Sequence, residues 1–239
     1  MARRADLQTA PDVVHFHDAR AEAFASRYRV SAAFQERAVI WATAIRAHVT
    51  ADSDVLDLGC GSGIFSFAAA EYAKTVIGID GSASMIALCN SDAERRGLSN
   101  AFFERHLIEN VAQEMDRRFD VVLCSSVLEY LDDLPGTLKI IAHMLRPSGT
   151  LIFSMPNQRS WYRSVEKVLH RLTGRPRYFG LVKANFDSDQ LRMSLDRAGL
   201  GLDSDVVFGN PPASGLMGLL PGGADRLKTM RLYTATKFS

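Results

Sequence analysis

The chain has 239 residues, of which 47% are hydrophobic and 23% are charged. These values exclude collagen, coiled coils and wholly disordered chains, and the length fits a single globular domain. The 28 basic and 27 acidic residues leave a net charge of +1, so the chain lacks the overall basic charge typical of nucleic-acid-binding proteins.

The cysteines and the first residues indicate the compartment. Cys60, Cys89 and Cys124 show neither a disulfide framework nor a CxxC metal spacing, so we expect buried thiols in a reducing environment. The N-terminal MARRADLQTAPDVV has no apolar signal-peptide core, and no run approaches the ~18 apolar residues of a membrane span. We therefore expect a cytoplasmic protein.

From the N-terminus, residues 12–49 carry apolar stripes at helical spacing, and we expect these helices to form a lid outside the core. Strands and helices then alternate, which predicts a parallel sheet covered by helices. The predicted strands are 55–58, 75–79, 101–105, 119–123, 150–154, 205–208 and 231–237. The predicted helices between them are 64–72, 83–96, 134–145 and 188–198.

The first predicted strand leads into a glycine-rich loop in the sequence VLDLGCGSG, residues 55–63. Gly59, Gly61 and Gly63 permit a tight turn with positive φ and let a ligand lie against bare backbone. The following helix directs its free N–H groups and the positive end of its dipole at the same place. The loop therefore predicts a ligand with an electron-rich or anionic part.

An acidic residue follows at the end of the second predicted strand. Asp80 lies 17 residues beyond Gly63, and a carboxylate there accepts hydrogen bonds from the two hydroxyls of a ribose. Loop, helix and acid together predict a pocket for an adenosine-like nucleoside. The alternative is a structural turn with an N-capping aspartate.

The spacing of the glycines bears on which nucleoside binds. In the nicotinamide pattern G-x-G-x-x-G/A, Gly59 and Gly61 fit, but Ile64 stands at the sixth position and Gly63 comes early. Asp57 also precedes the loop within the strand. The segment resembles the first motif, (D/E)xGxGxG, of the class I S-adenosylmethionine-dependent methyltransferases.

This resemblance extends from about residue 16 to the C-terminus, and residues 119–157 resemble the small-molecule branch that includes the O-methyltransferases of ubiquinone biosynthesis. It implies a Rossmann-like α/β fold with a seven-stranded, mostly parallel sheet of order 3-2-1-4-5-7-6. It implies S-adenosylmethionine as cofactor and S-adenosylhomocysteine as product. The single domain, 1–239, would comprise a helical lid (10–50), a cofactor-binding core (51–156), a basic amphipathic insertion (157–186) and the rest of the sheet (187–239).

The resemblance assigns roles to individual residues. Asp57 lies near the methionine amino group, Asp80 binds the ribose, Arg37 pairs with the cofactor carboxylate and Tyr28 closes over the cofactor; the alternative for Arg37 is an ordinary surface residue. The adenine-edge acid of many relatives is absent from residues 105–108. The full implied cofactor set is Tyr28, Arg37, Asp57, Gly59, Cys60, Gly61, Gly63, Asp80, Gly81, Met85, His106, Leu107, Cys124 and Ser125.

Methyl transfer from a sulfonium is an in-line displacement that an O-methyltransferase assists with a general base. The related branch often has Leu-Glu-His after the fourth strand, and this chain has Leu-Glu-Tyr, ending at Tyr130. We predict Tyr130, His15 and His17 as catalytic residues, and Tyr130, Trp161 and Tyr162 as substrate contacts. We predict no metal, because residues 124–127 lack the aspartates of the divalent-metal enzymes.

The insertion at residues 157–186 holds seven basic residues against the single acid Glu166, with an apolar stripe at helical spacing. Three interpretations are open. The favoured one is a lid over an apolar or anionic substrate; the others are contact with an anionic membrane surface and an ordinary solvated face. Residues 209–224 form a Gly/Pro-rich loop, and its Asn-Pro-Pro motif stands too late in the chain for an adenine methyltransferase.

The leading hypothesis is a small-molecule methyltransferase, with oxygen acceptors slightly ahead of nitrogen and carbon. An RNA or protein methyltransferase, an NAD(P)-dependent oxidoreductase and a non-catalytic cofactor-binding protein are the alternatives. The near-zero net charge argues against a nucleic-acid partner. The sequence identifies neither the acceptor nor the oligomeric state.

Overall fold

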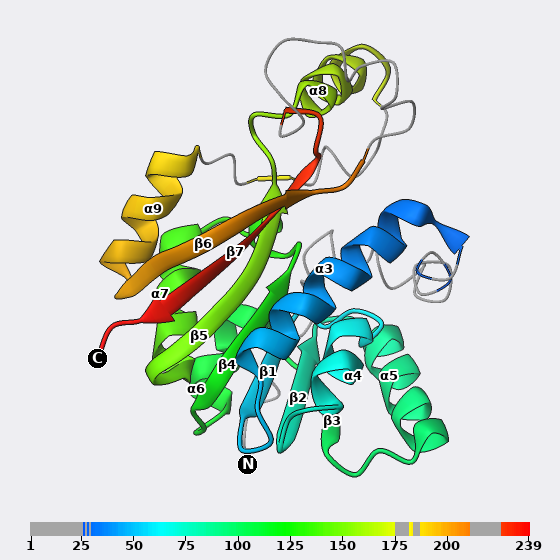
Figure 1. Ribbon diagram of the computed structural model, residues 1–239, viewed down its shortest axis with the longest axis vertical. Helices are drawn as coiled ribbons and strands as arrows, with labels where there is room; N and C mark the ends of the chain where they lie inside the picture. The colour runs from blue at the N-terminus through cyan, green and yellow to red at the C-terminus, as the bar shows by residue number, and fades with distance from the viewer. Residues whose placement is uncertain (1–25, 27, 29, 175–181, 184–186, 211–225) are drawn as a thin grey trace, which may run out of the picture.

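A computed structural model describes residues 26, 28, 30–174, 182–183, 187–210 and 226–239 (Figure 1). The predicted helical residues 12–25 and most of the Gly/Pro-rich loop at 209–224 lie outside this part of the chain.

Seven strands form one sheet in the order β3-β2-β1-β4-β5-β7-β6. The first five strands run parallel to one another, and β7 is antiparallel to both β5 and β6. This confirms the predicted order and the mostly parallel sheet. The strands are β1 Asp54–Leu58, β2 Thr75–Asp80, β3 Ala101–Arg105, β4 Phe119–Ser125, β5 Leu145–Pro156, β6 Leu200–Phe208 and β7 Met230–Lys237.

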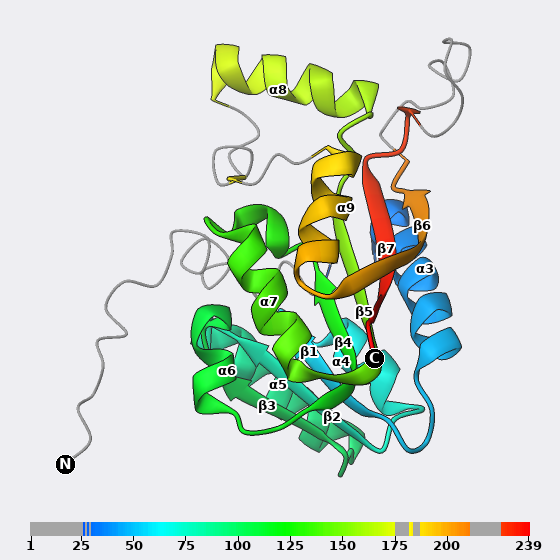
Figure 2. The ribbon, with the colours of Figure 1, turned by 90° about the vertical axis from the view of Figure 1, so that its left-hand side faces the viewer.

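Helices cover both faces of the sheet, as Figure 2 shows. One face carries α3 Ala32–His48, α4 Ile64–Ala70 and α5 Ala83–Arg96; the other carries α6 Val111–Glu114, α7 Leu134–Met144 and α9 Ser188–Arg197. On β4, Val121 and Leu123 pack into the core of the first face, and Val122 and Cys124 into that of the second. A central strand buried on both faces must be apolar along its length, which is why residues 119–123 are a strong strand signal.

Helix α3 belongs to the core, although it lies within the segment predicted as a lid. Its Trp41 and Ile45 are fully buried. The Trp41 ring stacks on the Phe65 ring of α4, with centroids 4.5 Å apart and planes at 21°. The N-terminal end of α3 reaches beyond the sheet, where Phe34 and Arg37 border a cavity. The helix is therefore both a layer of the core and a wall of the pocket.

Two strands are longer than predicted. β5 begins at Leu145, directly after α7, and passes through residues 147–149, which lie between the predicted helix 134–145 and the predicted strand 150–154. Ser148 there has a φ of 60°, and the register of β5 with β4 shifts, so these residues form an irregularity within the strand. β6 begins at Leu200 instead of residue 205. It is an edge strand whose middle residues, 203–206, are exposed, so the apolar pattern is interrupted along its length.

The insertion after β5 contains α8, Trp161–Thr173, which stands beyond the end of the sheet in Figures 1 and 2. The side chain of its N-cap residue, Ser160, accepts from the backbone N–H of Arg163 at 3.4 Å. None of the 13 residues of α8 is buried. Within the described part of the chain, no helix is long and apolar enough to cross a membrane.

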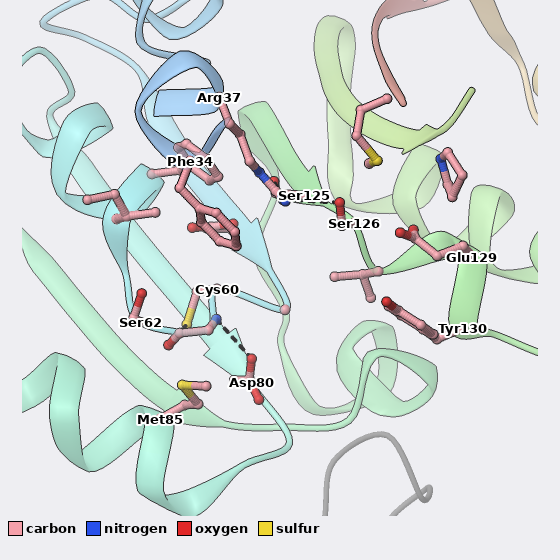
Figure 3. Close-up of a pocket in the computed structure, with 18 of the residues that line it drawn as sticks. Phe34, Arg37, Cys60, Ser62, Asp80, Met85, Ser125, Ser126, Glu129 and Tyr130 are labelled. Carbon is pink, nitrogen blue, oxygen red and sulfur yellow. Dashed lines mark hydrogen bonds between the residues drawn. The ribbon is translucent and has the colours of Figure 1, made fainter. Parts of the chain in front are cut away.

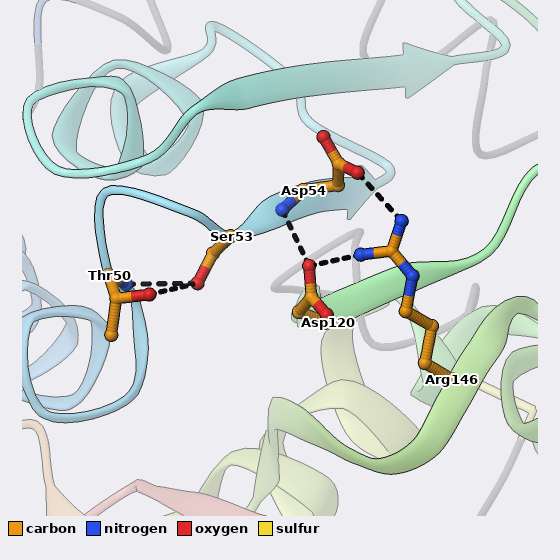
Figure 4. A network of polar contacts seen from close by, with 5 residues as sticks. All are labelled: Thr50, Ser53, Asp54, Asp120 and Arg146. Carbon is orange, nitrogen blue, oxygen red and sulfur yellow. Dashed lines mark hydrogen bonds and ion pairs between the residues drawn. The ribbon is translucent and has the colours of Figure 1, made fainter.

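A polar network joins β1, β4 and β5 at their amino-terminal ends, whereas the cavity lies at the carboxyl ends of the strands (Figure 4). Arg146 Nη2 donates to Asp54 Oδ2 at 2.8 Å, and Arg146 Nη1 donates to Asp120 Oδ2. Asp120 Oδ2 also accepts from the backbone N–H of Asp54 at 2.8 Å. Burial acts to raise the pKa of Asp54, but the hydrogen bond and charge of Arg146 outweigh it, so this pKa lies below its usual value.

We expect Arg146→Ala to lower the free energy of unfolding by about 1–2 kcal/mol at neutral pH, because two carboxylates lose their cation at a partly solvated site. Since the pKa of Asp54 is lowered, its stabilisation is present at neutral pH and is lost as pH falls through that pKa. Urea denaturation should therefore show a difference that shrinks towards about pH 3. Arg192→Ala, at an exposed site on α9, is the control; an equal loss there would contradict the prediction.

Candidate active site

The glycine loop after β1 has the predicted left-handed conformation. Gly59, Gly61 and Gly63 have φ values of 68°, 53° and 73°. A Cβ atom at Gly59 would lie 2.4 Å from Cγ2 of Val127, so no other residue fits there without displacing the loop after β4. The loop is held to β2, because the backbone N–H of Cys60 donates to the carbonyl of Ile79 at 2.9 Å.

A cavity of about 470 Å³ opens at the carboxyl ends of β1, β2 and β4, where a parallel sheet places its ligands (Figure 3). The predicted cofactor residues that line it are Tyr28, Arg37, Asp57, Gly59, Cys60, Gly61, Asp80, Gly81, Met85, His106, Leu107 and Ser125. Of the predicted substrate contacts, Tyr130 and Tyr162 line the same cavity. Segments from distant parts of the chain thus meet around one space.

Of the predicted site residues, three that the structure describes do not line this cavity, and two more fall outside the described part of the chain. Cys124 is fully buried in the core on the α7 side, and the Cβ position of Gly63 is occupied by Phe67 and Cys89. Both positions are packed for structural reasons. Trp161 is 45% exposed on α8, with the Arg226 guanidinium 6.0 Å from the centre of its ring. The other two, His15 and His17, lie outside the described residues.

Asp57 is a buried carboxyl group at the floor of the cavity. Its side chain accepts from Ser66 Oγ at 2.5 Å through Oδ2, and its Oδ1 has no hydrogen-bond partner among the described residues. Burial raises the pKa of Asp57 to about 7, although the Ser66 hydrogen bond acts in the opposite direction. An unpartnered buried acceptor beside a cavity fits a ligand that brings a cation or a donor, such as an ammonium group.

Asp80 connects the two loops at the ends of β1 and β2. Its Oδ2 accepts from the backbone N–H of Gly61 at 2.9 Å, and its Oδ1 accepts from that of Ser82 at 2.8 Å. Figure 3 shows the carboxylate between the glycine loop and Met85. Each carboxylate oxygen has two lone pairs, so both backbone bonds leave room for hydroxyl donors from a ligand.

Arg37 crosses from α3 to the end of β4. Its Nη2 donates to Ser125 Oγ at 2.6 Å and to Ser126 Oγ at 3.1 Å, and its guanidinium carbon lies 5.7 Å from the centre of the Phe65 ring. Its Nε is buried without a hydrogen-bond partner among the described residues. Arg37 is therefore a partly buried, hydrogen-bonded residue of the cavity wall, and a guanidinium in such a position is suited to an anionic ligand group.

Two aromatic side chains close the α3 side of the cavity. The rings of Tyr28 and Phe34 meet edge to face with centroids 4.9 Å apart, and Tyr28 also lies edge-on to Phe65 at 6.0 Å. Burial raises the pKa of the Tyr28 phenol, although Arg37 nearby acts to lower it. Tyr28 therefore remains a neutral hydrogen-bonding group at the cavity wall.

The segment after β3 borders the opposite side. His106 Nδ1 lies 2.5 Å from Glu114 Oε2, and its Nε2 lies 3.1 Å from Glu104 Oε2. Burial acts to lower the pKa of His106, but its hydrogen bonds to the two glutamates outweigh it and raise this pKa. Residues 105–108 contain no acid, but Glu109, one position later, also lines the cavity.

Glu129 is a buried acid in the cavity wall that was not among the residues predicted from the sequence. Glu129 is 2% exposed, and its Oε2 has no hydrogen-bond partner among the described residues. Burial raises the pKa of Glu129 to about 7, although the charges of Arg37 and Arg163 act against this. The sequence signal for Glu129 is the Leu-Glu-Tyr run, of which only Tyr130 was predicted as a site residue. Figure 3 shows both side chains at the same wall.

Helix α8 completes the mouth of the cavity with Tyr162, Arg163 and Glu166. Arg163 Nη1 pairs with Glu166 Oε2 at 3.4 Å. Within the described residues, no group of three or more His, Cys, Asp or Glu side chains is arranged to hold a metal ion.

Comparison with known families now bears on this arrangement. Residues 50–199 match a family model described as a methyltransferase domain. The chain belongs to this family of class I S-adenosylmethionine-dependent methyltransferases. The matched range contains the glycine loop, Asp80 and Glu129, so the family assignment and the cavity rest on the same residues.

Curated relatives of the family include two ubiquinone biosynthesis O-methyltransferases. The Serratia proteamaculans protein is 32% identical over 116 residues, which cover 48% of each chain. The Coxiella burnetii protein is 33% identical over 128 residues, which cover 54% of this chain and 52% of that one. The chain thus spans about half the length of the curated relatives it matches.

Solved structures share the fold over nearly the whole chain. The [4+2]-cyclase SpnF superposes with a TM-score of 0.72 at 18% identity, covering 98% of this methyltransferase-family chain and 99% of its own. The N-methyltransferase NodS from Bradyrhizobium japonicum, solved with S-adenosylhomocysteine, gives 0.66 at 17% identity, covering 95% and 97%. At these identities the likeness shows the fold.

We expect the free energy of unfolding to fall as pH rises from about 4 to about 7, with a smaller fall in Asp57→Asn. Because the pKa of Asp57 is raised in the folded state, its neutral form is favoured there, and the associated stability is lost as the group ionises. Each raised carboxyl contributes a slope of up to about 1.4 kcal/mol per pH unit. Glu129 has the same sign, so some slope remains in the variant.

Urea denaturation across this pH range tests the assignment. Asp196→Asn, at an exposed position on α9, should keep the wild-type slope. Superimposable curves for wild type and Asp57→Asn would show that Asp57 is not the buried acid.

Proposed function

We propose that this chain transfers the methyl group of S-adenosylmethionine to a small-molecule acceptor by direct in-line displacement, with a hydroxyl oxygen as the favoured acceptor atom. The observation that carries the proposal is one cavity holding two separate polar ends. Asp57 and Asp80 lie at the β1–β2 end, and Glu129 and Tyr130 lie at the β4 end. The small-molecule and oxygen assignments are supported by the curated relatives, which are O-methyltransferases of ubiquinone biosynthesis.

The residues at the β1–β2 end fit the cofactor group by group. Asp57 Oδ1 is the unpartnered acceptor for the ammonium group, and Arg37 is the cation for the carboxylate. Asp80 accepts from the ribose hydroxyls, while Met85 and Leu107 are apolar walls for the adenine. S-adenosylmethionine, when bound, supplies a methyl group already activated on a sulfonium. The chain therefore needs mainly to align donor and acceptor and to exclude water.

Glu129 is the residue that we assign as the general base, in place of the predicted Tyr130. A carboxylate with a pKa of about 7 is ionised in a substantial fraction at neutral pH, yet is basic enough to take a hydroxyl proton. Its Oε2 is the atom that would receive this proton as the new oxygen–methyl bond forms. Tyr130, beside it on the same wall, is then a hydrogen-bonding contact that orients the acceptor.

The mechanism invokes no metal ion, because the loop after β4 carries Ser125, Ser126 and Val127 where metal-dependent relatives have aspartates. The charges near this end of the cavity are those of Glu129 and of Arg37, which acts to lower the pKa of Glu129.

S-adenosylhomocysteine should raise the melting temperature of the protein, and NAD and NADP should leave it unchanged. Asp80→Ala should bind S-adenosylhomocysteine roughly tenfold to a hundredfold more weakly in calorimetry, since it removes the ribose acceptor and two hydrogen bonds that hold the loops. Asp196→Ala is the matched control. Stabilisation by NAD alone would overturn the proposed function.

Glu129→Gln should lower kcat for phenolic or catecholic acceptors by roughly 10²–10⁴-fold while leaving S-adenosylhomocysteine affinity unchanged. In the wild type, kcat should fall as pH drops below about 7, because protonated Glu129 accepts no proton. Tyr130→Phe should mainly raise KM and keep this pH profile. A Glu129→Gln enzyme with the wild-type pH profile would contradict the assignment of the base.

A further inference from the structure

Helix α8 presents a row of large apolar side chains to solvent. The row follows one side of the helix at intervals of three and four residues. Its members are Trp161 (45% exposed), Val165 (58%), Val168 (55%), Leu169 (48%) and Leu172 (78%). Five such residues on one helix form a contiguous apolar stripe, and a patch of this kind on a folded protein marks an interaction surface.

The stripe points away from the cavity. At 100° per residue, Arg163 falls about 175° and Glu166 about 115° from the centre of the stripe, while Tyr162 lies on its flank; these three residues line the cavity mouth. A lid of the kind favoured from the sequence would turn its apolar side towards an apolar substrate. In the structure the polar side of α8 borders the cavity and the apolar side faces outwards.

The charges around the stripe are almost all positive. Arg159, Lys167 and Arg171 are exposed on or just before α8, and Arg226 lies over the Trp161 ring. The one acid of the helix, Glu166, is paired with Arg163 on the cavity side. An apolar stripe bordered by cations is complementary to a bilayer whose headgroups are anionic. A second copy of this chain would instead bring like charges together.

We propose that α8 docks the protein onto the surface of an anionic lipid bilayer. The stripe would lie at the boundary of headgroups and acyl chains, with Trp161 at the depth where indole rings are favoured. Arg171, about 105° from the centre of the stripe, and Lys167, about 145° from it, would reach the lipid headgroups with their long side chains. The helix has 13 residues, which suits a helix lying in the interface and is too short to span the bilayer. This inference goes beyond the proposed methyl transfer and does not depend on it.

Flotation of the full chain with lipid vesicles tests the proposal. The wild type should bind phosphatidylcholine vesicles containing phosphatidylserine, and bind pure phosphatidylcholine vesicles much more weakly. Val168→Gln combined with Leu172→Gln keeps good helix formers on α8 and should weaken binding by at least about tenfold. Lys167→Gln and Arg171→Gln should each weaken binding to the anionic vesicles by roughly fivefold.

Val39→Gln is the matched control, since Val39 is 66% exposed on a different helix, and it should bind as the wild type does. Melting curves of every variant verify folding without reference to cofactor binding. Failure of the wild type to float with anionic vesicles would overturn the proposal, as would equal floating of the α8 variants. Self-association that Val168→Gln with Leu172→Gln abolishes, without vesicle binding, would assign the stripe to a second copy instead.

Discussion

The burial of the Asp57 carboxyl beneath the glycine loop is the constraint on which the site depends. A carboxyl group removed from water, with Ser66 on one oxygen and no partner from the described part of the chain on the other, is costly to ionise, and its pKa rises to about 7. That cost is offset when a cationic group occupies the adjoining space. The left-handed backbone at Gly59 and Gly61 makes this space available, and Asp80 fixes the loop by accepting from Gly61.

The same electrostatic device occurs at the other end of the cavity. Burial brings the pKa of Glu129 to about 7 as well, and Arg37 stands between the two regions with its guanidinium on Ser125 and Ser126. Two carboxyl groups with raised pKa values in one cavity are typical of a functional site. In the proposed function, the carboxyl group on β1 holds the cofactor and the one in the loop after β4 takes a proton. The charge of Arg37 acts to lower the pKa of Glu129, which favours the ionised form of that group.

Helix α8 combines two roles in one short segment because its two sides differ in polarity. Tyr162, Arg163 and Glu166 continue the cavity wall, and the stripe around Val168 and Leu172 is turned outwards. A helix that buries none of its residues gains little from the core, so its stability and its position are expected to respond to whatever covers the stripe.

The sequence by itself determined the strands, the glycine loop and the position of Asp80, because these depend on local patterns: apolar runs, glycines at fixed spacing and an acid at a strand end. The sheet order and the cofactor followed from the resemblance of the glycine motif to the methyltransferase family. It did not show that Cys124 and Gly63 are packed behind the cavity wall. Nor did it show that Glu129, next to the predicted Tyr130, is a buried carboxyl group with a raised pKa. Burial, pKa and the direction of the α8 stripe depend on which segments meet in space. Only the tertiary structure decides these, because desolvation and charge act between residues that are far apart in the chain.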